Sequence, residues 1–73
     1  MIIENVINGF EVSLELDIDE GLSWCWINKN NLSSSLDFAL FHGGLFDHVS
    51  EDIVPIHPST IKKIESWALA NGY

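Results

Sequence analysis

The sequence predicts a small α+β domain. It should contain an antiparallel sheet of three strands, or of four, with an N-terminal β-hairpin and two helices packed on one face of the sheet. Residues 10–19 alternate apolar and polar side chains without exception, which is the period of a strand with one buried face. The preceding Asn8-Gly9 is the strongest short signal for a hairpin turn, and residues 58–70 carry apolar side chains at helical spacing. All 73 residues are expected to form a single domain.

The predicted hairpin joins residues 2–7 to residues 10–18. Its two-residue loop fixes the register and pairs Ile7 with Phe10, since loop length sets strand pairing in a hairpin. One face of the hairpin then carries Ile3, Ile7, Phe10, Val12 and Leu14, with Asn5 as its polar exception. The opposite face carries Ile2, Glu4, Val6, Glu11, Ser13, Glu15 and Asp17. Side chains on the same face of one strand lie about 6.6 Å apart, so this second face is a closely spaced acidic surface.

A turn at residues 19–21 leads to a predicted third strand at residues 22–28, in which Leu22, Trp24 and Trp26 share a face. We expect these two tryptophans and Trp67 in the core, because aromatic side chains bury large apolar surfaces. If any were exposed, a protein–protein contact would become the better interpretation. Residues 53–56 are a candidate edge strand, because Pro55 has no backbone donor for a ladder.

Two helices follow the sheet. Residues 33–35 are three serines, suited to cap a helix that carries Leu36, Ala39 and Leu40 and ends at Gly43-Gly44. The second helix begins at Pro58, a residue favoured at the first helical position, and ends at Asn71-Gly72. Its apolar stripe is Ile61, Ile64, Trp67 and Ala68.

The charge is strongly acidic, with eleven acidic residues, three lysines, no arginine and a net charge of −8. Six of the eleven acids fall within residues 1–20, which contain no lysine or arginine. Direct binding to nucleic acid or to an anionic membrane is not expected, because both need clustered basic residues. The sequence shows no signal peptide, no apolar run of transmembrane length and a single cysteine, so we expect a cytoplasmic protein without a disulfide.

Neither catalysis nor metal binding is expected. His42 and His48, with Asp47 beside them, are the nearest approach to a metal site, but the five residues between the histidines include two glycines and no cysteine pair supports them. His42 is more simply a side chain that compensates the dipole at a helix end. Cys25 lies in a predicted strand, where a buried inert thiol is usual. With no phosphate-binding loop or catalytic motif, we expect no enzyme activity, no metal and no cofactor.

The acidic face has two interpretations. It is either a solvated outer surface, or the binding surface of a non-catalytic module that engages a basic protein surface. The second would suit an inhibitor that imitates nucleic acid, of the antitoxin, immunity or mobile-element accessory kind. Its binding residues would be Glu4, Glu11, Glu15, Asp17, Asp19 and Glu20. The alternative function is a self-associating structural domain, a homodimer formed through Ile2, Val6 and an exposed sheet edge.

Overall fold

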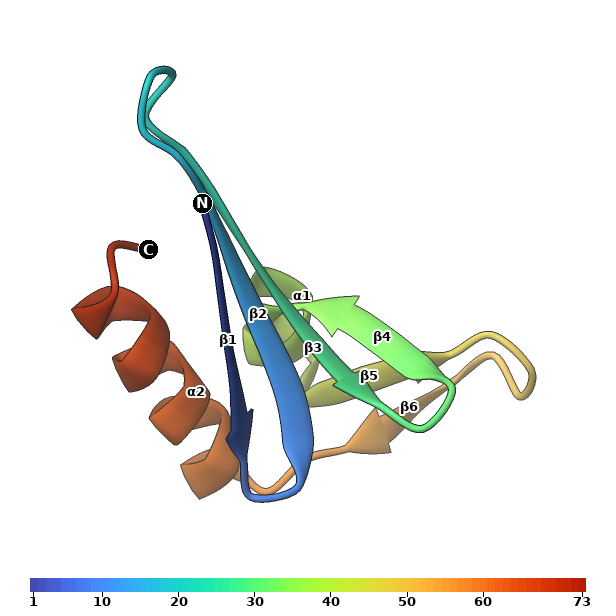
Figure 1. The fold of residues 1–73 in the computed structure, drawn as a ribbon. Coiled ribbons are helices and arrows are strands. Elements are labelled where there is room, and N and C mark those ends of the chain that lie inside the picture. The colour runs from blue at the N-terminus through green and yellow to red at the C-terminus, as the bar shows by residue number, and fades with distance from the viewer.

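The computed structural model describes all 73 residues and has an α+β architecture (Figure 1). Strands β1 to β4 form one antiparallel sheet in chain order, and β5 and β6 pair as a separate two-stranded sheet. The elements are β1 (Ile2–Ile7), β2 (Phe10–Asp17), β3 (Leu22–Lys29), β4 (Leu32–Ser35), α1 (Leu36–His42), β5 (Gly44–Asp47), β6 (Asp52–Pro55) and α2 (Pro58–Ala70). The predicted α+β class is therefore confirmed, with a main sheet of four strands.

The N-terminal hairpin has the predicted register. Ile7 lies opposite Phe10, Glu4 opposite Ser13 and Ile2 opposite Glu15. Asn8 and Gly9 both have positive φ, at 50° and 84°, as the two central residues of a type I′ turn require. The inner face of the hairpin contributes Val12 and Leu14 to the core, whereas Ile2 and Val6 on the opposite face remain exposed.

The fourth strand of the main sheet comes from a different segment than expected. Lys29 pairs with Leu32 across the tight turn Asn30-Asn31, so the serine run forms β4 before it caps α1. Asn30 has a φ of 54°, a left-handed conformation that asparagine tolerates. The segment expected as an edge strand does form one, β6, but it pairs with β5 outside the main sheet.

Both helices begin and end where the sequence predicts. The Ser35 hydroxyl accepts a hydrogen bond from the Phe38 backbone N–H (3.1 Å), and Gly43 follows α1 as its C-cap. Pro58 opens α2, and the His57 imidazole Nδ1 accepts from the Ser59 N–H (3.2 Å). At the other end, the Tyr73 N–H donates to the Ala68 carbonyl (3.0 Å), which closes the helix with its predicted Asn-Gly signal.

A single buried cluster joins the sheet to the helices. It draws residues from one face of β2 and β3, from α1, from β5, from the residue that follows β6, and from α2. Its members are Val12, Leu14, Cys25, Ile27, Leu36, Ala39, Leu45, Ile56, Ile61, Ile64 and Ala68. Trp67 packs against this cluster as expected. Trp24 and Trp26 do not, and the prediction that they belong to the core is wrong.

Two hairpins extend away from the centre of the molecule. Figure 1 shows the turn between β2 and β3 projecting beyond the rest of the main sheet, and the β5–β6 hairpin projecting on the side away from α2. Neither helix has the length and the apolar character that crossing a bilayer requires.

Candidate protein-binding face

The face of the main sheet opposite the buried cluster is termed here the outer face. Strand alternation and the register place on it side chains from all four strands. They are Ile2, Glu4 and Val6 of β1, Glu11, Ser13, Glu15 and Asp17 of β2, Leu22, Trp24, Trp26 and Asn28 of β3, and Ser33 and Ser35 of β4. The outer face is therefore both acidic and apolar.

Trp24 and Trp26 stand on the outer face because of the pairing between β2 and β3. Trp24 lies opposite Glu15 and Trp26 opposite Ser13, and directly paired residues of an antiparallel sheet project to the same side. Their side chains are 42% and 44% exposed, respectively. The intervening Cys25 takes the buried position, at 2% exposed. Leu22, Trp24 and Trp26 do share a face as predicted, but it is the face that carries the carboxylates.

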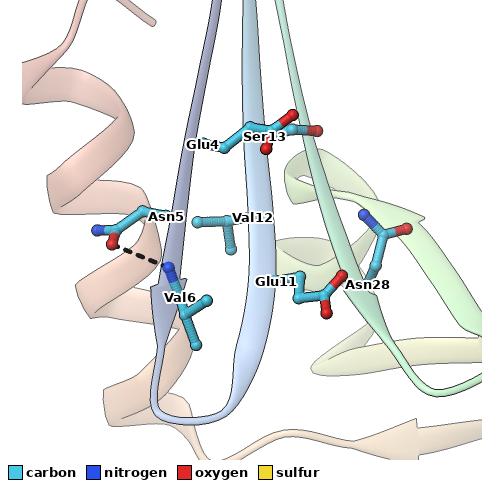
Figure 2. Close-up of a pocket in the computed structure, with 7 residues that line it drawn as sticks. All are labelled: Glu4, Asn5, Val6, Glu11, Val12, Ser13 and Asn28. Carbon is cyan, nitrogen blue, oxygen red and sulfur yellow. Dashed lines mark hydrogen bonds between the residues drawn. The ribbon is translucent and has the colours of Figure 1, made fainter.

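Glu4 and Glu11 border a shallow hollow of about 700 Å³ on the outer face. Figure 2 shows Glu4 next to Ser13 and Glu11 next to Asn28, with the side chains spread across β1, β2 and β3. The hollow is open to solvent, and five of the seven residues that line it are polar or charged. Glu15 lies further along β2, beside Trp24.

The remaining three predicted binding residues lie toward the projecting end of the β2–β3 hairpin. Asp17 belongs to the outer face, but its carboxylate Oδ1 accepts a hydrogen bond from the Glu20 backbone N–H (3.2 Å) and so also closes the turn. Asp19 and Glu20 lie in the turn itself and are exposed. Asp17 lies six residues along β2 from Glu11, a span of about 20 Å, and Asp19 lies in the turn beyond it. The six carboxylates thus form a long strip with its two ends far apart.

No lysine side chain shares the outer face. Lys29 is on the opposite side of β3 by strand alternation, and its Nζ lies 4.5 Å from the centroid of the Phe10 ring. Lys62 and Lys63 are on α2. The acidic side chains that accept hydrogen bonds within the chain are Asp17, Asp37 and Asp47. The carboxylates of Glu4, Glu11 and Glu15 are therefore available to an external cation.

Strand β1 forms an edge of the main sheet. The Asn5 side-chain carbonyl accepts a hydrogen bond from the Val6 backbone N–H (2.8 Å), as the dashed line in Figure 2 shows. Asn5, the polar exception of the predicted apolar face, is exposed, and its side chain occupies one backbone donor of β1. This contact leaves one fewer donor for an added strand.

The side chains considered for catalysis or metal binding have other surroundings. Burial raises the pKa of the Cys25 thiol to about 11, with the Asp37 carboxylate contributing, so the thiol stays protonated near neutral pH. The His42 ring lies tilted against the Phe38 ring with 4.3 Å between centroids, and the His48 and Phe46 rings are nearly perpendicular with 4.8 Å between centroids. No three His, Cys, Asp or Glu side chains are grouped so as to hold a metal ion.

A second, smaller hollow of about 260 Å³ adjoins Trp26. Phe38, Phe46 and His48 supply its aromatic walls together with Trp26, and the run of serines from Ser33 supplies the rest. The Ser34 hydroxyl accepts from the Phe46 N–H (3.0 Å). The aromatic surface of the outer face therefore continues past β4 toward β5, a continuity that sequence reasoning missed because it spans two sheets.

Comparison of the chain with protein-family models, with curated proteins and with solved structures finds no match.

Proposed function

We propose that this chain is a non-catalytic binding module whose outer face engages a basic surface of another protein. The observation that carries the proposal is the composition of that face. It presents Glu4, Glu11, Glu15 and Asp17 on β1 and β2 beside the exposed Trp24 and Trp26 on β3, without any lysine. A face that serves only solvation usually mixes charges of both signs, since like charges repel one another. Exposed aromatic side chains are enriched at protein–protein interfaces.

The position of the two helices supports the assignment of the outer face as the exposed side of the main sheet. In the arrangement that we infer, α1 and α2 pack on the side of the main sheet that carries Leu14 and Ile27, since both helices contribute to the same buried cluster. The outer face then has no covering layer of its own. Carboxylates at such a face steer a basic partner by long-range attraction and set specificity, while most of the affinity comes from desolvated contacts.

A partner of this kind is a nucleic-acid-binding protein. Its groove is basic because it must neutralise phosphates, so a rigid acidic strip can occupy the groove and exclude nucleic acid. The chain would then act as an inhibitor, of the antitoxin, immunity or mobile-element accessory type. The whole strip from Glu4 to Glu20 would contribute, with the projecting turn as its far end.

Replacement of Glu4, Glu11 and Glu15 by lysine tests the proposal. Asp17 is left unchanged because it closes the β2–β3 turn. A matched control replaces Glu51, Asp52 and Glu65, which lie off the outer face, and changes the net charge by the same amount. Immobilised wild type and control should retain from host lysate a protein that salt and added DNA release, and the outer-face variant should not. Equal retention by all three proteins would reject the proposal.

Self-association through β1 is the second candidate function. Ile2 and Val6 are exposed beside the free edge, which favours strand pairing between copies. The charge of the outer face and the Asn5 contact at the edge both oppose it. Sedimentation at low and high salt separates the candidates, because a dimer should strengthen as salt screens the carboxylates.

A further inference from the structure

We infer that the partner presents arginine, and not lysine, to the outer face, with guanidinium groups stacked on Trp24 and Trp26 and paired with the neighbouring glutamates. The inference rests on the proposed function and specifies the chemistry of its partner. It depends on one juxtaposition: exposed indoles on β3 lie beside unpaired carboxylates on β2.

The register brings each indole close to a carboxylate. Glu15 lies directly across from Trp24, and the Cβ atoms of such a pair are about 4.5–5.5 Å apart. Trp26 lies across from Ser13, so Glu11 and Glu15 are its diagonal neighbours, at about 7–8 Å. A single side chain lying on either indole is therefore within reach of a glutamate.

Neither the two exposed indoles nor the glutamates beside them have a cationic partner within the chain. The nearest lysine in sequence, Lys29, lies against Phe10 on the other side of the sheet. The carboxylates that make intramolecular hydrogen bonds are those of Asp17, Asp37 and Asp47. Of these, only Asp17 lies near an exposed indole, as a diagonal neighbour of Trp24, and it is not one of the glutamates that we pair with the guanidinium groups. An external cation therefore displaces no internal partner of Glu11, Glu15, Trp24 or Trp26.

Arginine satisfies this pair of groups better than lysine does. The guanidinium is planar, so its face can stack on an indole while its edge donates two hydrogen bonds to a carboxylate. An ammonium group is a compact point charge that is more strongly hydrated, and it has no flat face to stack. Tryptophan is also the best aromatic partner for a cation. Adjacent tryptophan and glutamate side chains thus discriminate between the two basic residues.

Charge opposes a second copy of this chain as the occupant of the outer face. Two outer faces brought together would set Glu4, Glu11 and Glu15 against the same carboxylates with no lysine between them. Like charges placed across an interface are strongly unfavourable. The occupant that the charges favour is an extended, cationic segment of another protein.

Two synthetic peptides of equal length test the inference, one alternating arginine with serine and the other alternating lysine with serine. Titration calorimetry at low salt should show the arginine peptide binding severalfold more tightly, because an ammonium group also makes a cation–π contact but lacks the flat face and the two-bond geometry of the guanidinium. Replacement of both Trp24 and Trp26 by leucine should bring the two affinities within about twofold of each other. Trp67 remains in that variant as a fluorescent reporter of folding.

Phe41→Leu is the matched control, because Phe41 is an aromatic residue on α1 that is 85% exposed and lies off the outer face. This variant should keep the arginine preference. Equal affinity for both peptides, with binding lost when Glu4, Glu11 and Glu15 become lysine, would overturn the arginine inference and leave the proposed function standing. If neither peptide binds at low salt, the inference is also overturned, and the lysate experiment decides the proposed function separately.

Discussion

Identical Ile→Val substitutions on opposite sides of the main sheet test the assignment of its two faces. Ile27 is 0% exposed within the core cluster, whereas Ile2 is 62% exposed on the outer face. Removing one methylene from a buried isoleucine costs about 1 kcal/mol, because the lost contacts and the small cavity add together. The same change at an exposed position stays within about 0.5 kcal/mol. A domain of this size typically has about 3–5 kcal/mol of stability, so both variants should remain folded.

Urea unfolding followed by tryptophan fluorescence measures the difference. With a slope of about 1 kcal/mol per molar urea, Ile27→Val should lower the midpoint by about 1 M and Ile2→Val by less than half as much. Thermal unfolding should show a loss of about 4–8 °C for Ile27→Val. Equal shifts for the two variants would refute the assignment, because Ile2 would then be buried. A shift for Ile2→Val that grows with protein concentration would identify self-association as the cause.

Three further outcomes are expected. Ser35→Ala should cost about 1 kcal/mol because it removes the cap of α1, whereas Ser33→Ala at the exposed start of the serine run should cost less than about 0.5 kcal/mol; urea midpoints compare the two. Cys25 should resist a thiol reagent at pH 8 until denaturant is added. Because the pKa of its thiol is raised from 9.0 to about 11 in the folded state, the contribution of the protonated thiol to the free energy of unfolding should be fully present below pH 9 and be lost between pH 9 and 11. Gly44→Ala should lower the melting temperature more than Gly21→Ala. A Cβ at Gly44 would lie 2.8 Å from the Pro55 Cα, whereas a Cβ at Gly21 would meet no atom within 4 Å and would add only the strain of the positive φ of 68°.

The hairpin could be predicted in full because two local rules agree there. The Asn8-Gly9 turn fixes the pairing of β1 with β2, and the alternation of residues 10–17 selects the same faces independently. The ends of both helices could be predicted equally well, because their caps depend on Ser35, Pro58 and the Asn-Gly pair within a few residues of each helix. Each of these signals is complete within a short segment of the chain.

The tryptophans show where sequence reasoning failed. Within β3 the alternation separates Trp24 and Trp26 from Cys25 and Ile27, but it does not say which set faces the core. Hydrophobicity alone favours the indoles. The pairing of Asp17 with Leu22 across the β2–β3 turn decides otherwise, because it aligns the tryptophans with the carboxylates of β2. The separate sheet of β5 and β6 was missed for a related reason, since pairing partners of short strands are not encoded within either strand.

On the proposed function, the carboxylates and the indoles of the outer face have complementary tasks. Exposed apolar surface such as Trp24, Trp26 and Val6 promotes unspecific association when nothing opposes it. The neighbouring glutamates oppose unspecific association with any acidic molecule, including a second copy of the chain and nucleic acid itself. The same glutamates attract a cationic partner, so one set of charges both rejects the wrong surfaces and recruits the right one. Charge reversal should therefore do more than abolish binding of the basic partner. It should also expose the indoles to acidic proteins, which the lysate experiment would reveal as retention of acidic proteins that the wild type does not retain.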